Sequence, residues 1–174
     1  MGTIFVDNLE PQSGTSLTLG ASGDTITKAS GVNTNALGIK GVDSWRMTSS
    51  FTATTGSTQV LTSNLERDDT YQNGKIGTGM SESSGIFTFP ETGFYIVSYY
   101  TNTNSSAGSS YFTNTIQLTT NNSAYNSVAE GNSHIADTSN QKVRFAYDSS
   151  HTITVMGSTN GNTTYMTFIR LGDT

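Results

Sequence analysis

Two histidines, His134 and His151, are the only imidazole groups of this 174-residue chain, and imidazole is the side chain best suited to acid–base catalysis near neutral pH. Neither histidine lies in a recognisable catalytic motif. No serine lies in a Gly-x-Ser-x-Gly pattern, and no glycine-rich loop followed by Lys indicates a phosphate site. Cysteine is absent, which excludes thiol nucleophiles, disulfides and thiolate metal ligands. The sequence therefore predicts a protein that is not an enzyme.

One acidic cluster, Glu66, Asp68 and Asp69 in "LERDD", has side chains of the type that bind hard cations. The cluster lacks the alternating ligand spacing of a calcium loop, so it fits a solvated turn better than a metal site. A glycosidase would need two carboxylates positioned in a cleft, and the sequence places no such pair. We therefore expect neither a metal nor a cofactor.

Three loop segments, 102–110, 121–127 and 157–163, are rich in Asn, Ser, Thr and Gly, with tyrosines in or next to them. Amides and hydroxyls can bond sugar hydroxyls, a tyrosine ring can stack on a sugar, and binding residues are often carried by loops on a rigid scaffold. The candidate contacts with a host surface glycan or protein are Asn104, Tyr111, Asn122, Tyr125, Asn160, Asn162 and Tyr165. Ordinary solvated hairpin loops have the same composition, so that alternative stays open.

Charge and hydropathy exclude two classes of partner. The net charge is −5 and the eight Lys and Arg residues are scattered, which argues against binding to nucleic acid. The nearest approach to a cluster, Lys142 with Arg144, fits the outer face of a strand. No run of 18 apolar residues predicts insertion into a membrane.

The elements that must position these side chains are strands. From Trp45 onward, apolar and polar residues alternate in short runs separated by turn-rich segments, and eight Tyr, eight Phe and one Trp supply a core. "WRMTSSFTA" predicts Trp45 and Met47 on one face and Arg46 on the other. "KVRFAYD" predicts Val143 and Phe145 inward. Such strands predict an antiparallel sandwich or barrel with one solvated side per sheet.

Two runs, 94–100 "FYIVSYY" and 165–171 "YMTFIRL", carry large apolar residues on both faces. A strand that is apolar on both sides is usually buried on both, and a two-sheet sandwich covers only one side. We therefore expect another copy of the chain to cover the second side, although scattered surface aromatics remain an alternative. The predicted contacts between copies in these runs are Phe94, Ile96, Tyr100, Met166 and Phe168.

Residues 1–42 form a different region, in which "SGTSLTLGA" and "SGDTITKAS" repeat with a register of nine. A repeat that buries so little apolar surface must stack on further copies, and one chain holds only two. We therefore expect Leu17, Leu19 and Ile26 to pack around an axis shared with other chains. The predicted organisation is a short repetitive β anchor at 1–42 and a head domain at 43–174.

The segment 85–100, "GIFTFPETGFYIVSYY", resembles the signature of the complement globular-head family, relatives of the tumour-necrosis-factor (TNF) jelly rolls. The order of the surrounding strands, from about 45 to 172, fits as well. The resemblance implies an all-β antiparallel jelly-roll sandwich that assembles as a compact homotrimer. It also implies that the two-sided strands meet near the three-fold axis.

The N-terminal stretch "VDNLEPQSGTSLTLGASGDTIT" is similar to segments of fibre and other virion structural proteins of tailed bacteriophages, particularly marine ones. This resemblance implies synthesis in the host cytoplasm, consistent with the lack of a visible signal peptide, and a place on the virion surface. The expected function is a trimeric capsid decoration protein or short fibre that docks on capsid or tail proteins through residues 1–42. A tail-fibre or tail-tip adhesin for a host receptor and a cellular trimeric binding module are the alternatives.

Overall fold

The computed structural model describes residues 23, 39–69, 74–105, 111–130, 133–137 and 141–172, the segment 133–137 by its backbone alone. The predicted contacts Leu17, Leu19 and Ile26 lie outside the described residues. The described head begins at Ile39, and its first strand begins at Gly41, two residues before the predicted boundary. Within the described part of the chain, no helix is long and apolar enough to cross a membrane.

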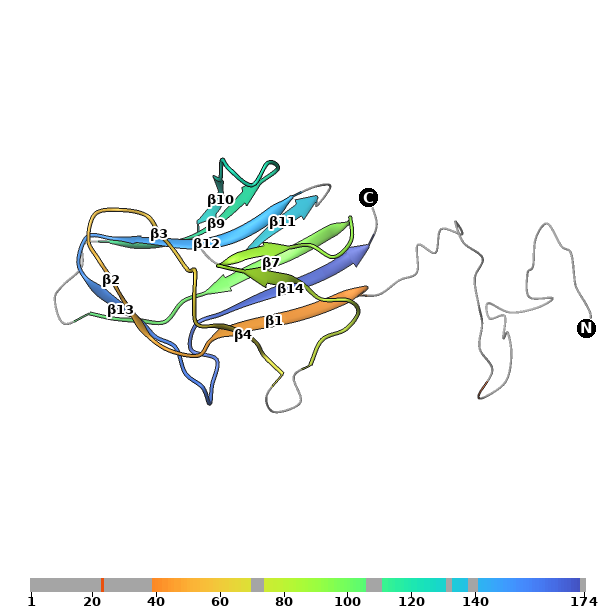
Figure 1. Cartoon of the computed structure of the whole chain (residues 1–174), viewed down its shortest axis with the longest axis horizontal. Helices are drawn as coiled ribbons and strands as arrows, with labels where there is room; N and C mark the ends of the chain where they lie inside the picture. Colours follow the sequence, from red (N-terminus) through yellow and green to blue (C-terminus); the bar gives the residue numbers. More distant parts are fainter. Residues whose placement is uncertain are drawn as a thin grey trace, which may run out of the picture. The chain divides into compact units, whose positions relative to one another are not determined.

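The head is built from two main antiparallel sheets that face each other (Figure 1). The first sheet has the order β11-β7-β14-β1-β4. Its strands are β11 (Ser133–Asp137), β7 (Phe94–Tyr100), β14 (Tyr165–Gly172), β1 (Gly41–Met47) and β4 (Leu65–Arg67). Neighbours in this sheet are far apart in sequence, because the chain passes repeatedly between the two sheets.

The second sheet has the order β10-β9-β12-β6-β5, and β3 pairs with the far part of β12. A small third sheet, β2-β13-β8, closes one end. The strands of the second sheet are β10 (Asn126–Glu130), β9 (Phe112–Thr119), β12 (Lys142–Ser149), β6 (Ile86–Thr88), β5 (Ser81–Ser83) and β3 (Gln59–Val60). Those of the third are β2 (Phe51–Ala53), β13 (Ile153–Val155) and β8 (Thr103–Asn104).

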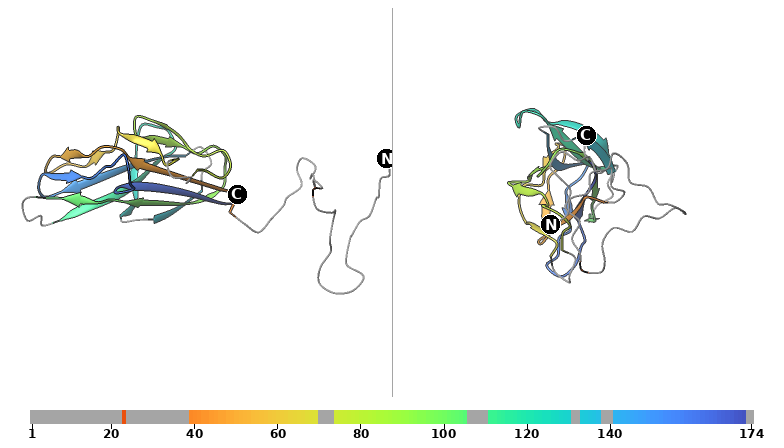
Figure 2. Two further views of the ribbon diagram at one scale, coloured as in Figure 1. Left: turned by 90° about the horizontal axis from the view of Figure 1, so that it is seen from below. Right: turned by 90° about the vertical axis from the view of Figure 1, so that its right-hand side faces the viewer.

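Both ends of the described head meet at one edge of the molecule. Gly41 in β1 pairs with Arg170 in β14, so the first strand starts where the last one finishes. Figure 2 shows the orange and dark blue strands meeting at this end. We call it the base of the head. The other end, where β1 stops at Met47, is the far end.

Aromatic rings fill the space between the two main sheets. Phe87 is the centre of this cluster: its ring lies 5.3 Å from that of Trp45, 5.5 Å from that of Phe145 and 5.2 Å from that of Phe168. The inward residues predicted from alternation are confirmed, because Trp45, Met47, Val143 and Phe145 are all buried. Ring pairs of this kind add about 0.5–1.5 kcal/mol each beyond the area that they bury.

The predicted strand "WRMTSSFTA" is wrong as a single element. β1 ends at Met47, and the chain bends through residues 48–50 before β2 begins in the third sheet. Arg46 also departs from the prediction of an outward, solvated position, since it is only 3% exposed. The alternation correctly predicts that Arg46 lies on the outer face of its sheet. A loop that is distant in the sequence covers it there.

Gly85 has a conformation that the β5–β6 hairpin requires. Ser84 and Gly85 both have positive φ, 52° and 80°, as a two-residue hairpin turn demands. A Cβ atom on Gly85 would lie 1.9 Å from the carbonyl oxygen of Leu61. Both the turn and the close approach of Leu61 therefore require glycine at this position.

We expect Gly85→Ala to destabilise the head by about 2 kcal/mol or more, because the new methyl must displace backbone atoms as well as adopt a strained φ. Gly56→Ala is the matched control. Gly56 has the same φ of 80°, but a Cβ atom there has no neighbour within 4 Å. Urea unfolding should therefore show a loss for Gly56→Ala of only about 1 kcal/mol. Equal losses for the two variants would contradict the proposed role of Leu61.

Candidate functional site

The outer face of the first sheet is the first candidate surface. Alternation along β7 buries Tyr95, Val97 and Tyr99 in the core and turns the other residues of the strand outward. Along β14 the inward residues are Met166 and Phe168. The outward apolar residues, which we call the apolar face, are Val42, Ile76, Phe94, Ile96, Tyr100, Tyr165, Ile169 and Leu171.

Strand register brings these residues together. Ile96 pairs with Ile169, Ile169 with Val42, and Val42 with Ile76 through an isolated bridge. An aliphatic row therefore crosses three strands and reaches the loop beside β1. Nearer the far end, the rings of Tyr100 and Tyr165 stack with centroids 5.1 Å apart and planes at 25°.

Much of this face is open to solvent in the single chain. Phe94 and Tyr100 are each 44% exposed, Leu171 is 43% exposed and Ile76 is 56% exposed. The aliphatic row and the Tyr100–Tyr165 pair are separated by Thr167 and Ser98, which pair with each other between them. Exposed apolar residues are common singly, whereas groups on neighbouring strands are typical of interaction surfaces. Most of the apolar face is therefore the second apolar side that the sequence shows in the runs 94–100 and 165–171.

The structure corrects two of the predicted contacts between copies. Met166 and Phe168 are 0% and 1% exposed, so they belong to the core and cannot reach another chain. The predicted Phe94, Ile96 and Tyr100 do lie on the outer face. Ile169 and Leu171 were missed, although they occupy the alternate positions of the same run, because local alternation does not reveal which set faces inward.

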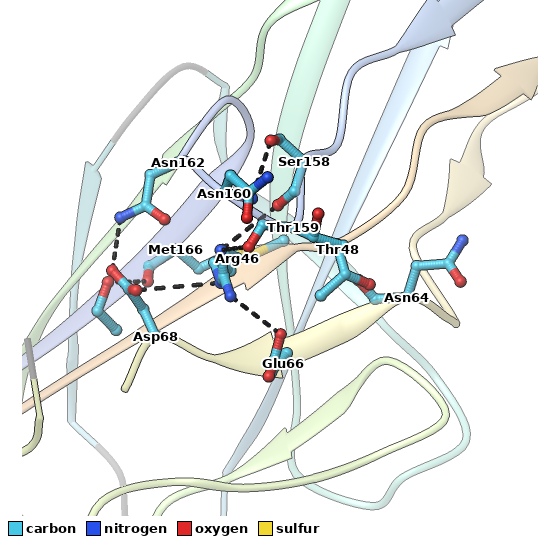
Figure 3. Close-up of polar contacts among 11 residues, drawn as sticks. Arg46, Thr48, Asn64, Glu66, Asp68, Ser158, Thr159, Asn160, Asn162 and Met166 are labelled. Carbon is cyan, nitrogen blue, oxygen red and sulfur yellow. Dashed lines mark hydrogen bonds and ion pairs between the residues drawn. The ribbon is translucent and has the colours of Figure 1, made fainter. Parts of the chain in front are cut away.

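A buried charge network covers the far end of β1 (Figure 3). The Arg46 guanidinium donates to the carbonyl oxygen of Thr159 at 2.8 Å and to the Glu66 carboxylate at 3.2 Å. It also lies 4.0 Å from the carboxylate of Asp68, whose side chain is 4% exposed. On its other side, Asp68 accepts a hydrogen bond from the Asn162 amide.

This network overturns the reading of "LERDD" as a fully solvated turn, because two of its three carboxylates are bound to Arg46. It also uses Asn162, a predicted receptor contact, to hold the segment 157–163 against the sheet. Asn160 stays exposed beside it. In the described part of the chain, no group of three or more His, Asp or Glu residues is arranged to hold a metal ion.

The predicted contact loops do not form one surface. The backbone N–H of Met156 donates to the carbonyl of Asn102, and that of Ser158 donates to the carbonyl of Met47, so both of these loops lie at the far end. Asn104 belongs to β8 there. The turn 119–124 begins at Thr119, which pairs with Lys142 at the opposite end of β9. Eight strand residues, about 25 Å, separate the two ends.

Two further predicted contacts are placed individually. Tyr165 lies on the apolar face, stacked on Tyr100, so it belongs to that surface and not to a loop. Tyr111 is 47% exposed at the far end of β9, where its backbone pairs with Ser150. The side chain of His134 lies outside the described residues, and the ring of His151 contacts its neighbour Ser150 at 3.1 Å.

In the turn 119–124, side chains of the turn itself bond the backbone N–H groups. The Thr119 hydroxyl accepts the N–H groups of Asn121 and Asn122, and the Asn121 side chain accepts those of Ser123 and Ala124. Such side-chain bonds are typical of Asx and related turns. Asn122 lies in this turn with a φ of 58°.

Tyr125 anchors this turn to the second sheet. The Tyr125 hydroxyl donates to the Asn122 side chain at 2.7 Å, and the Arg144 guanidinium lies 3.8 Å from the ring centroid. Burial raises the pKa of Tyr125, and the charge of Arg144 opposes that effect. Because the guanidinium covers one face of the ring, at most the other face is free to stack on a sugar.

Comparison with known proteins supports the fold. No protein family and no curated protein matches this sequence. Crystal structures of murine APRIL at pH 8.5 and pH 8.0 each match with a TM-score of 0.55 and 8% identity, covering 75% of this chain and 98% of theirs. The head of this chain is accordingly an all-β antiparallel jelly roll of the TNF-like type.

Proposed function

We propose that this chain is a homotrimeric, non-catalytic module, a capsid decoration protein or short fibre that displays its jelly-roll head on a bacteriophage particle. The observation that carries the self-association is the apolar face across β7, β14 and β1, and the number of three copies is what the TNF-like fold implies. Its four most exposed large side chains are each 43–56% exposed. Covering one such side chain contributes about 1 kcal/mol, so the face supplies a driving force for self-association.

A double substitution on β7, within the apolar face, tests this assembly. We expect Ile96→Asp combined with Tyr100→Asp to give a folded monomer, because the new carboxylates stay solvated in the single chain but lose their hydration in the interface. Sedimentation velocity should show a species with the mass of one 18.5 kDa chain in place of the species of three chains. Tyr111→Asp, a change at an equally exposed site outside the face, should leave the trimer intact. A wild-type protein that sediments as a monomer would refute the trimer.

The place on a virion is supported by the resemblance of the N-terminal stretch to virion structural proteins. The geometry of the head is compatible with it. Residues 39–40 enter β1 at the base, whereas the segment 157–163 lies at the far end. A head attached through its N-terminal side would therefore present the far-end loops away from the attachment point.

Removal of residues 1–38 tests the attachment. The deletion stops at 38 because Lys40 donates its backbone N–H to the carbonyl of Arg170 and β1 begins at Gly41. We expect the shortened chain to fold and to form trimers, since the core and the apolar face lie within 39–172. We also expect it to be absent from purified particles, measured by labelling the head. Normal incorporation of the shortened chain would contradict an attachment role for 1–38.

A tail adhesin that binds a host glycan or protein is the second candidate. It is favoured by the turn 119–124 of the second sheet, in which the exposed Asn122 is held by a hydrogen bond from Tyr125. Labelled localisation on intact particles separates the two roles, because a decoration protein should cover the capsid and an adhesin should mark the tail. Absence of the chain from every particle would favour a cellular trimeric module.

A further inference from the structure

The loop between β13 and β14 is held to the rest of the head on both sides of an exposed asparagine. On the N-terminal side, the carbonyl of Thr159 accepts a hydrogen bond from the Arg46 guanidinium at 2.8 Å. On the C-terminal side, the Asn162 amide donates to the Asp68 carboxylate. Asn160 lies between these two contacts and is exposed (Figure 3). Solvent therefore reaches Asn160 although the loop is anchored.

Asn160 is followed by Gly161, and this pair has a chemistry of its own. The backbone nitrogen that follows an asparagine can attack the carbon of the side-chain amide, because the attack closes a five-membered ring. A side chain on the second residue hinders the attack, and glycine has none. An Asn-Gly pair is therefore better suited to this reaction than an asparagine followed by a larger residue.

The fold does not require glycine at position 161. A Cβ atom on Gly161 would have no neighbour within 4 Å, and the φ of this residue lies outside the left-handed region. Gly157 in the same loop is different, because a Cβ atom there would lie 2.5 Å from backbone atoms of Ser49. The open space around Gly161 leaves room for the ring to close and for water to enter.

The attacking nitrogen is also available. Among the residues that the structure describes, the backbone N–H of Gly161 donates to no acceptor. The Asn122–Ser123 pair shows the contrast: the N–H of Ser123 donates to the Asn121 side chain at 3.0 Å, and the Asn122 side chain accepts the hydroxyl of Tyr125. Both reacting groups of that pair must first break a hydrogen bond, which costs free energy.

Asn162 gives a second contrast within the same loop. Its side-chain amide is bonded to the Asp68 carboxylate. The next residue is Thr163, whose branched side chain crowds the backbone nitrogen. Asn162 is thus held away from the reaction that is open to Asn160.

We propose that Asn160 is a site of spontaneous deamidation. The Gly161 nitrogen forms a bond to Cγ of Asn160 and gives up its proton, while the bond from Cγ to the amide nitrogen breaks and ammonia leaves. Water then opens the succinimide at either carbonyl, which gives aspartate or isoaspartate. Each event adds one negative charge to a chain whose net charge is −5.

The new carboxylate changes the charge of the far end. The guanidinium of Arg46 already pairs with the carboxylates of Glu66 and Asp68, so it is not free to neutralise another one. The neutral loop therefore becomes acidic with age. That this loop faces away from a particle rests on the proposed display of the head, whereas the reaction depends on the loop alone.

Ageing of the full-length protein at mildly alkaline pH tests the site, because a base must remove the proton of the attacking nitrogen. Peptide mapping should show the change from amide to carboxyl at Asn160 at least about tenfold faster than at Asn122 and Asn162, whose groups are not free to reach the reactive geometry. Trypsin leaves Asn160 and Asn162 on one peptide, 145–170, so fragment ions must assign the position. Equal rates at the three asparagines, or no change at Asn160, overturn the proposal.

Gly161→Ala is expected to slow the reaction at Asn160 by about tenfold while the fold stays intact, because its methyl group crowds the nitrogen and meets no neighbour within 4 Å. Asn160→Gln is the matched control and should gain no charge at this position, since the longer side chain disfavours ring closure. Urea unfolding verifies that both variants fold. An unchanged rate for Gly161→Ala, or a product that is aspartate alone, overturns attack by the Gly161 nitrogen.

The reaction is followed on the isolated protein, which keeps this result separate from the proposed function. A protein that decorates particles but leaves Asn160 unchanged overturns the modification site and leaves the display standing. A protein that is absent from particles but deamidates at Asn160 overturns the display and supports the site.

Discussion

Phe168→Asp is expected to prevent the head from folding. Phe168 is 1% exposed, and its ring packs on those of Phe87, Phe145 and Phe89 at 5.2, 5.9 and 6.4 Å. Removing a buried aromatic side chain costs about 3–5 kcal/mol, and burying an unpaired carboxylate costs several more. Together these losses approach the whole stability of a small domain, about 5–15 kcal/mol. Circular dichroism and urea unfolding should show no cooperative transition.

Phe94→Asp is the informative contrast, because Phe94 belongs to the neighbouring strand and was predicted from the same two-sided pattern. Phe94 is 44% exposed on the apolar face, so the carboxylate remains hydrated in the single chain. We expect this variant to fold and to assemble more weakly. A Phe168→Asp protein that folds normally but does not assemble would mean that Phe168 lies on the outer face of β14 and not in the core.

Arg46→Met is expected to destabilise the head by about 3–5 kcal/mol, although the new side chain fits an apolar environment. The substitution leaves the Asp68 carboxylate, 4% exposed, without its guanidinium, and breaking a buried ion pair from one side has this cost. It also removes the hydrogen bond that holds the carbonyl of Thr159. Urea unfolding measures the loss, and limited proteolysis should show faster cleavage within 157–163.

Two controls separate charge from packing in this network. Glu66→Gln should cost about 1 kcal/mol or less, because the Glu66 side chain is 48% exposed and solvent screens its pair with Arg46. The double substitution Arg46→Met with Asp68→Asn should be more stable than Arg46→Met alone, since no buried charge is left unpaired. A double variant that is less stable than the single one would show that the network acts mainly through its hydrogen bonds.

The loops show how far composition alone can mislead. Asn162 and Asn122 look alike in the sequence, each in a polar loop with a nearby tyrosine. The structure assigns Asn162 to the Arg46 network, whereas Asn122 stays exposed and accepts the hydroxyl of Tyr125. The difference depends on Asp68, 94 residues before Asn162. No local pattern contains that information.

The sequence by itself determined the class of the fold, most of the inward residues of β1 and β12, and the apolar character of both faces of 94–100 and 165–171. These features follow from the two-residue period of a strand, which is local. Only the tertiary structure decided which face is inside, because that choice depends on pairs such as Phe168 with Val97 and Trp45 with Met166. It likewise decided that Arg46 is buried, through a loop more than 100 residues later in the chain. The two-residue period of a strand specifies which residues share a face. The packing of distant strands and loops decides which of the two faces is buried in the core.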